Sequence, residues 1–274
     1  MSPQVVLVTG CSSGGIGHAL CEEFASKGCK VYASSRRAET IGEFKSPGIE
    51  KLALDVTSDE NVATALAYIV EREGKIDIVV NNAGVIAPGP LVEQSINDVK
   101  RAFETNVFAI IRVCKAVAPI MAKRRSGTIV NIGSIVGEIA TPWNGVYCAS
   151  KASVNSISEV LFMELKPLGI DVLHVAPGGV RSNIANNGIE HFSLGENTLY
   201  SAYLPDIIRR INASQSPKSM PNDVFAEKVV KKVLASKSPR YLTLGHNASV
   251  FSILKWLPRT FVLLFLWRSF SKQR

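Results

Sequence analysis

The segment that most constrains the fold lies near the N-terminus, where a strand, a glycine-rich loop and a helix follow one another. Val5 to Thr9 is a short apolar run of mostly β-branched residues, which is typical of a buried parallel strand. Residues 10–17 (GCSSGGIG) contain four glycines, and residues 18–25 place apolar side chains at helical spacing. Glycines between a strand and a helix let the backbone approach a diphosphate, which then sits at the positive end of the helix. The order of these segments predicts a dinucleotide-binding fold rather than a simple tight turn.

The next strand-like run ends in two arginines. Residues 30–35 (KVYASS) lead into Arg36 and Arg37, and neither Asp nor Glu occupies the end of the strand. In dinucleotide-binding folds an acidic residue near this point binds the ribose hydroxyls of NAD, whereas arginine accommodates the additional phosphate of NADP. We therefore expect NADP(H) rather than NAD. The alternative is that both arginines are solvated loop charges.

Apolar strand-like runs alternate with helical patterns along most of the chain. The expected strands cover residues 5–9, 31–35, 49–54, 76–81, 128–133 and 170–176. This alternation predicts an α/β fold with a doubly wound (Rossmann-type) parallel sheet and helices on both faces. The chain has 274 residues, 46% of them hydrophobic, which is enough for one large core. We expect a single catalytic domain at residues 1–245, followed by an apolar, basic extension at residues 246–274.

Four polar residues suggest a proton-transfer site. Tyr147 and Lys151 are spaced i and i+4, so on a helix they share one face, and Ser134 and Asn106 precede them. A free tyrosine has a pKa of about 10, and a nearby ammonium group lowers that value toward neutrality. Such a set suits the reduction of a carbonyl or the oxidation of an alcohol. Taken alone, a Tyr and a Lys at this spacing are more often an ordinary surface pair.

Seven motifs, in the same order, resemble those of the short-chain dehydrogenase/reductase superfamily. The resemblance runs from about residue 4 to about residue 183. Besides the glycine loop, the motifs are residues 54–56 (LDV), 81–84 (NNAG), 106–107 (NV), 129–134 (IVNIGS), Tyr147 with Lys151, and 177–180 (PGGV).

The resemblance implies a role for each matching residue. Tyr147 would protonate the developing alkoxide, and Ser134 would steady the substrate oxygen. Lys151 would lower the pKa of the tyrosine and bind the nicotinamide ribose, and Asn106 would hold a water that relays protons. Including Tyr147 and Lys151, the implied cofactor-binding residues are Gly10, Ser12, Ser13, Gly15, Ile16, Arg36, Arg37, Asp55, Val56, Asn82, Ala83, Gly84, Pro177, Gly178, Val180 and Ser182.

The glycine loop departs from the family pattern. The usual spacing is T-G-x-x-x-G-x-G, but here four residues separate Gly10 from Gly15, so the loop is one residue longer. Either Gly14 or Gly15 could be the middle glycine, and we align the family pattern on Gly15, Ile16 and Gly17. The additional glycine can absorb an insertion because it tolerates positive φ.

Cysteines, histidines and net charge exclude other classes of site. The five cysteines and four histidines are scattered without metal-ligand spacing, so neither a disulfide framework nor a metal site is expected, and a reducing compartment follows. The net charge of +8 fits phosphate-bearing ligands or an anionic membrane surface. Because the basic residues form no nucleic-acid motif, no nucleic-acid partner is expected. No N-terminal signal peptide is expected either, since the first residues lead directly into a strand.

The C-terminal region lacks the regular alternation of strands and helices that is expected in the rest of the chain. Residues 181–219 are polar and irregular and suggest a substrate loop, whereas residues 223–234 read as a helix. Residues 250–267 (VFSILKWLPRTFVLLFLW) are apolar but interrupted by Lys255, Pro258 and Arg259. A membrane span needs about 20 apolar residues, so we expect a segment lying in the membrane interface. The alternative is a helix packed on the catalytic domain or on a second copy in a homo-oligomer.

The loop, the arginine pair, residues 139–143 (IATPW) and the apolar tail are most similar to the acyl-dihydroxyacetone-phosphate reductase branch. This resemblance implies NADPH-dependent reduction of a lipid ketone at the cytosolic face of the endoplasmic reticulum or at a lipid droplet. A hydroxysteroid or retinol-type dehydrogenase is the alternative enzyme. The alternative of another class is a non-catalytic NADP-binding membrane or lipid-droplet protein, which the complete proton-transfer set disfavours.

Overall fold

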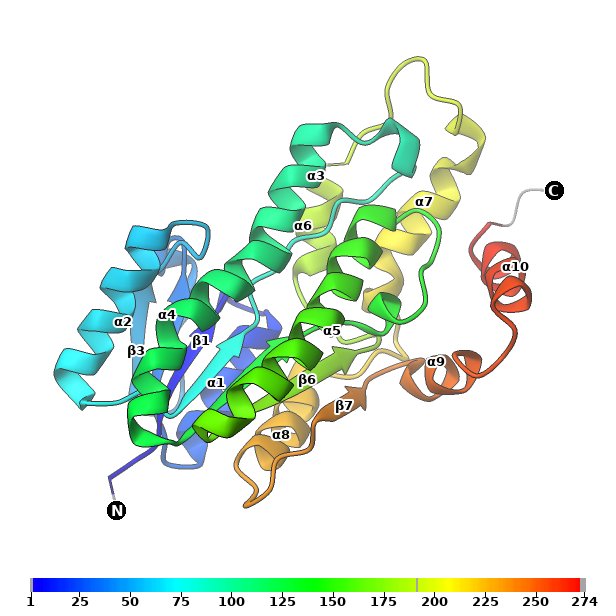
Figure 1. Ribbon diagram of the computed structural model, residues 1–274. Coiled ribbons are helices and arrows are strands. Elements are labelled where there is room, and N and C mark those ends of the chain that lie inside the picture. The colour runs from blue at the N-terminus through cyan, green and yellow to red at the C-terminus, as the bar shows by residue number, and fades with distance from the viewer. Residues whose placement is uncertain (1, 191, 272–274) are drawn as a thin grey trace.

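The computed structural model describes residues 2–190 and 192–271. A seven-stranded parallel sheet forms its centre, in the order β3-β2-β1-β4-β5-β6-β7 (Figure 1). The strands are β1 (Val5–Thr9), β2 (Lys30–Ser35), β3 (Ile49–Ala53), β4 (Ile78–Asn81), β5 (Gly127–Ile132), β6 (Ile170–Pro177) and β7 (Tyr241–Leu244). The predicted doubly wound α/β fold is therefore confirmed.

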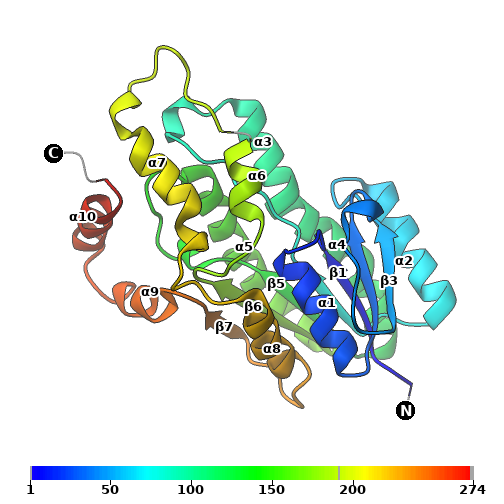
Figure 2. The ribbon, with the colours of Figure 1, turned by 180° about the vertical axis from the view of Figure 1, so that it is seen from behind.

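Helices cover both faces of the sheet, as Figures 1 and 2 show from opposite sides. The principal ones are α1 (Ile16–Ser26), α2 (Asp59–Glu73), α3 (Ile96–Phe103), α4 (Ala109–Arg124), α5 (Gly145–Leu165), α6 (Ile184–Glu190), α7 (Leu204–Ile211), α8 (Asn222–Val233), α9 (Ala248–Leu254) and α10 (Arg259–Phe270). On one face Leu20 and Phe24 of α1 pack with Phe225 of α8. On the other face α2, α4 and α5 enclose the second part of the core. Because the central strands β1 and β4 are buried from both sides, they read as continuous apolar runs.

The direction of the sheet order reverses between β1 and β4. Successive strands run outward from β1 through β2 to β3, and the chain then returns to place β4 on the opposite side of β1. In open α/β sheets the carboxyl ends of the strands at such a switch point form the ligand-binding crevice. Gly10 follows β1 and Asn82 follows β4, so the first two motifs meet at this crevice.

Two parts of the sequence-based expectation need correction. The seventh strand, β7, was not predicted, because it has four residues, lies at the sheet edge and is only partly buried. Residues 181–219 are also not a plain irregular loop, since they include α6 and α7. Helix α7 has Pro205 in its first turn and buries Ile207 and Ile211 beside Trp143.

The C-terminal extension packs on the catalytic domain along one stripe. Val262 and Leu266 of α10 are buried with Phe251 and Leu254 of α9 in a cluster that also contains Ile139. Figures 1 and 2 both place α9 and α10 at the end of the molecule beyond β7. This is the arrangement of the packed-helix alternative, although other apolar side chains of α10 are exposed.

One continuous helical stretch in the described part of the chain is long and apolar enough to cross a membrane. It covers Ile96–Arg124, and 44% of its most apolar window is buried inside the protein. Ile110, Val113 and Val117 of this stretch belong to the core cluster under the sheet. The stretch is therefore explained as a core helix.

Candidate active site

The glycine-rich loop forms one end of a single elongated pocket. Gly10 has a φ of 72°, and a Cβ atom there would lie 2.6 Å from the Cα of Ala83. Gly17 is equally restricted, because its Cβ would lie 2.6 Å from the carbonyl oxygen of Gly10. Gly15 is the N-cap of α1 and lines the pocket, so the first backbone N–H groups of α1 lie beside it. The backbone here can approach a diphosphate, and the helix terminus favours its charge.

The lengthened loop is accommodated at Gly14. This glycine has a φ of 72° and does not line the pocket, whereas Gly15 and Ile16 do. The side chain of Asn183, which also lines the pocket, holds the loop by donating from Nδ2 to the carbonyl oxygen of Ser13 at 2.6 Å. Ser13 does not line the pocket and faces Gly42 instead.

The end of β2 brings hydroxyl groups and one guanidinium to the pocket. Arg36 and Ser35 line it together with Ser12, and Thr40 joins their hydroxyls, with its Oγ1 3.0 Å from Ser35 Oγ and 3.5 Å from Ser12 Oγ. In the described residues, the hydroxyls of Ser12, Ser35 and Thr40 have no hydrogen bond to a carboxylate. The donors suit the additional phosphate of NADP, so the residues present fit that cofactor. Arg37, the other predicted arginine, does not line the pocket.

The rest of the expected cofactor residues extend along the same pocket. Asn82 fixes the crevice by donating from Nδ2 to the carbonyl oxygens of Thr9 and Gly10, each at 2.9 Å. Further expected residues that line the pocket are Asp55, Val56, Ala83, Gly84, Pro177, Gly178, Val180 and Ser182. In the described residues, no cluster of three or more His, Cys, Asp or Glu side chains is arranged to hold a metal ion.

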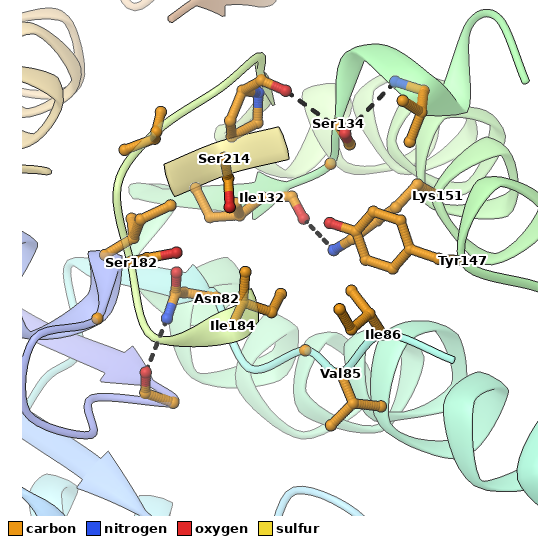
Figure 3. A pocket seen from close by; sticks show the side chains of 18 of the residues that line it. Asn82, Val85, Ile86, Ile132, Ser134, Tyr147, Lys151, Ser182, Ile184 and Ser214 are labelled. Atoms are coloured by element: carbon orange, nitrogen blue, oxygen red, sulfur yellow. Dashed lines mark hydrogen bonds between the residues drawn. The ribbon is translucent and has the colours of Figure 1, made fainter. Parts of the chain in front are cut away.

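Tyr147 and Lys151 lie one turn apart on α5 and face the same part of the pocket as Ser134 (Figure 3). The Nζ of Lys151 lies 5.6 Å from the centre of the Tyr147 ring and donates to the carbonyl oxygen of Ile132 at 2.7 Å. The Ser134 hydroxyl donates weakly to the carbonyl oxygen of Pro177 at 3.4 Å. The helix spacing and the end of β5 therefore bring a phenol, an ammonium and a hydroxyl together.

Burial dominates the acid–base properties of this group. It raises the pKa of Tyr147 to about 12, against the opposing effects of the Arg210 charge and a hydrogen bond with Ser134. The expected net lowering of the tyrosine pKa is therefore not found in this structure, because burial outweighs the groups that favour the phenolate. Burial also lowers the pKa of Lys151 to about 8. At neutral pH the phenol is therefore protonated and the ammonium charged.

Asn106 lies behind the pocket. It belongs to a π-helical turn, Glu104–Phe108, between α3 and α4, and its side chain is fully buried. Its Nδ2 donates to the carbonyl oxygen of Val85 and to Ser150 Oγ, both at 2.9 Å, and its Oδ1 accepts from the Val85 N–H at 2.8 Å. Asn106 therefore holds the strand-end loop against α5 and does not itself line the pocket.

Several lining residues were not anticipated as site residues. Arg210 of α7, Phe251 of α9 and Phe270 of α10 enclose the end of the pocket beside Tyr147. Trp143 joins them and contacts the rings of Tyr200, Tyr203 and Trp267 at centroid distances of 5.8, 5.2 and 5.6 Å, respectively. The sequence indicated a substrate loop at residues 181–219, but nothing in the sequence placed the C-terminal tail against it.

Comparison with known proteins agrees with this geometry. Residues 4–191 match the model of the family described as short chain dehydrogenase. A 3-ketodihydrosphingosine reductase from Bacteroides thetaiotaomicron is 33% identical over 244 residues, covering 89% of this chain and 88% of the relative. An NADPH-dependent 1-acyldihydroxyacetone phosphate reductase from Saccharomyces cerevisiae is 30% identical over 257 residues, covering 90% of this chain and 84% of the relative.

A solved structure extends the similarity to the whole fold. A short-chain dehydrogenase from Streptomyces avermitilis has a TM-score of 0.81 at 30% identity, covering 98% of this chain and 97% of that one. The family match, the Tyr147 and Lys151 geometry and the hydrogen-bond donors at Arg36 agree with one another. The chain belongs to the short-chain dehydrogenase family and is an NADP(H)-dependent oxidoreductase.

Proposed function

We propose that this enzyme uses NADPH to reduce a ketone on a lipid-like substrate of the 1-acyl-dihydroxyacetone phosphate type. One observation carries the proposal: the substrate end of the pocket is enclosed by Phe251 and Phe270 of the tail, whose outer surface is apolar and exposed. An acyl chain could leave the pocket along such a surface. The similarity to a reductase named for this substrate supports the choice of ketone.

The residues beside the pocket have distinct roles in this reaction. Bound NADPH supplies the hydride. Tyr147, protonated at neutral pH, donates its phenolic proton to the alkoxide oxygen as the carbonyl is reduced. Ser134 donates a hydrogen bond to the same oxygen, and the charge of Lys151 stabilises the phenolate that remains. Asn106 acts from behind, by fixing Val85 and α5.

A substrate panel tests the proposal. Purified enzyme is assayed by NADPH oxidation with 1-palmitoyl-dihydroxyacetone phosphate, 3-ketodihydrosphingosine, a ketosteroid and retinal. We expect the highest kcat/KM for the acyl ketone phosphate, and Tyr147→Phe should remove most turnover while NADPH binding is retained. A higher kcat/KM for the steroid or for retinal would favour the alternative enzyme class. Absence of turnover with every carbonyl would favour the non-catalytic alternative.

We also propose that the tail rests in the membrane interface, which would place the enzyme at the cytosolic face of the endoplasmic reticulum or on lipid droplets. Helix α10 turns Val262 and Leu266 inward, and its other apolar side chains are exposed. Phe261, Leu264 and Phe265 are each between 47% and 58% exposed. An apolar patch next to a pocket mouth fits a substrate that partitions into lipid.

Vesicle flotation tests membrane binding without disturbing the core. We expect the combined variant Phe261→Ser, Leu264→Ser and Phe265→Ser to lose flotation with phosphatidylcholine/phosphatidylserine vesicles while its unfolding temperature is retained. The matched control replaces Val92, Met163 and Leu199 by Ser, since these are between 62% and 81% exposed and lie elsewhere. Equal flotation of both variants and the wild type would refute the proposal. A change from dimer to monomer in the α10 variant alone would instead assign the patch to a second copy.

A further inference from the structure

Arg210 places a positive charge at the substrate end of the pocket. The reaction proposed above assigns no role to this charge. Arg210 lies near the end of α7 and lines the same pocket as Tyr147 and Ser134. Its neighbour Arg209 has a different environment, because it pairs with Asp206 at 2.6 Å and does not line the pocket. The two adjacent arginines therefore separate into one that is neutralised by a carboxylate and one that faces the pocket.

The contacts of Arg210 orient its guanidinium without neutralising it. Its Nε and Nη2 both donate to Thr141 Oγ1, at 3.2 and 3.0 Å, and the ring of Phe270 lies 5.5 Å from its central carbon. In the described residues, no carboxylate lies within ion-pairing distance of Arg210, and its Nη1 has no hydrogen-bond partner. A guanidinium held in this way still has N–H groups that can donate hydrogen bonds to a bound ligand.

The charges around the substrate end are unbalanced. Lys151 adds a second buried cation there, and burial penalises its charged form. The described lining of the pocket includes one carboxylate side chain, that of Asp55, and it lies beside Arg36 at the opposite end. Arg210 is close enough to Tyr147 for its charge to lower the pKa of the phenol. A partly buried positive charge is stabilised when a negatively charged ligand binds beside it. The unbalanced cations therefore indicate an anionic ligand at this end of the pocket.

We propose that Arg210, oriented by Thr141 and Phe270, forms a subsite for an anionic group on the substrate, of the phosphate monoester class, close to the carbonyl that is reduced. A guanidinium fork matches phosphate oxygens with two parallel hydrogen bonds. The inference rests on the proposed function and adds to it. It selects a ketone that carries a phosphate near the carbonyl, and it disfavours uncharged ketones and those that carry an ammonium group.

A matched pair of substrates tests the subsite. The assay compares 1-palmitoyl-dihydroxyacetone phosphate with its uncharged parent, 1-palmitoyl-dihydroxyacetone, at saturating NADPH. We expect the ratio of their kcat/KM values to fall about 100-fold in Arg210→Met, and less in Arg210→Lys, which keeps the charge but loses the fork. Arg209→Met, the matched control on the same helix, should keep the wild-type ratio. An unchanged ratio in Arg210→Met would overturn the proposal.

A binding measurement separates failure of the subsite from failure of the proposed function. Octyl phosphate and octanol are titrated calorimetrically into the enzyme with NADP⁺ bound. Tight binding of octyl phosphate that Arg210→Met abolishes would support the subsite even if every ketone in the panel proved inert. Equal binding by wild type and variant would overturn it whatever the panel shows. Thr141→Val offers a second variant with an intact charge, and its octyl phosphate affinity should also fall.

The same variants distinguish a substrate phosphate from two other phosphates that Arg210 could bind, those of the cofactor and of lipid headgroups. The KM for NADPH should be unchanged in Arg210→Met, because the phosphate of the cofactor is expected beside Arg36 at the other end. Flotation with phosphatidylserine vesicles should also be unchanged, since Arg210 faces the pocket. Loss of either property, with the substrate ratio retained, would assign the charge to the cofactor or to lipid headgroups and overturn the proposal.

Discussion

At the residue scale, the chemistry of the site depends more on burial than on the spacing of its side chains. The i and i+4 spacing predicted that Tyr147 and Lys151 share a face, and they do. It could not predict that Lys151 would donate to the Ile132 carbonyl or that burial would raise the pKa of Tyr147 to about 12. Sequence spacing fixes which side chains are neighbours on a helix, whereas desolvation depends on every segment packed around them. The sequence also did not identify Arg210 as a site residue, because it lies in a region without a motif and only the packing of distant segments brings it to the pocket.

The buried ammonium of Lys151 has a consequence for stability. Its pKa falls from the ordinary value of 10.5 to about 8, so the charged form is penalised in the folded state. Between these two pH values the unfolded chain binds a proton that the folded chain does not, and stability rises with pH. Below pH 8 the cost is fully present and amounts to about 3 kcal/mol.

The variant Lys151→Met removes this cost. We expect its free energy of unfolding, relative to wild type, to be most favourable below pH 8 and to lose about 3 kcal/mol of that advantage as the pH rises to about 10.5. Denaturant titrations of both proteins at several pH values measure the difference, in which the other titrating groups cancel. A difference that does not vary with pH would contradict the assignment of a charged, desolvated Lys151.

At the element scale, the strands and the motifs at their carboxyl ends were predictable because both signals are local. Six strands of the sheet were expected near their observed positions, and the glycine loop, Asn82 and Ser134 all lie at strand ends. Two features depend on distant packing and were not predictable. Strand β7 is held at the sheet edge by pairing with β6, and the π-turn that carries Asn106 is held by Val85 and Ser150.

The end of β2 gives an element-scale prediction. Neighbouring residues on an extended backbone project to opposite sides, and here Arg36 lines the pocket while Arg37 does not. We expect Arg36→Ala to raise the KM for NADPH about 10-fold or more, with little effect on the KM for NADH, because one charge-assisted contact to the phosphate is lost. Arg37→Ala is the matched control and should behave like wild type. Equal effects of the two substitutions would show that neither arginine binds the phosphate selectively.

At the scale of the whole molecule, the tail packs against the catalytic fold. From the sequence we predicted a boundary at residue 246, because the amino-acid composition changes there. Composition alone does not show whether an apolar helix packs on protein or contacts lipid. The structure has both surfaces on one helix: a stripe of Val262, Leu266 and Phe270 packed inward and the remaining apolar side chains exposed. Phe270 also accepts a hydrogen bond from Trp143 at its carbonyl oxygen, at 3.3 Å, which closes the pocket wall. Removing the tail would therefore open the site as well as detach the exposed patch.

Two leucines on α10 test whether the tail and the sheet unfold together. Leu266 is buried and Leu263 is exposed, so the same substitution probes the two faces of one helix. We expect Leu266→Ala to destabilise the protein by about 2–3 kcal/mol, because the cavity lies in a small peripheral cluster, and Leu263→Ala by less than about 0.5 kcal/mol. If the tail is part of a single cooperative unit, Leu266→Ala shifts one unfolding transition seen alike by circular dichroism and by tryptophan fluorescence. A separate early transition that leaves the main one in place would show instead that the tail is an independent unit, and the pocket would then open without unfolding of the sheet.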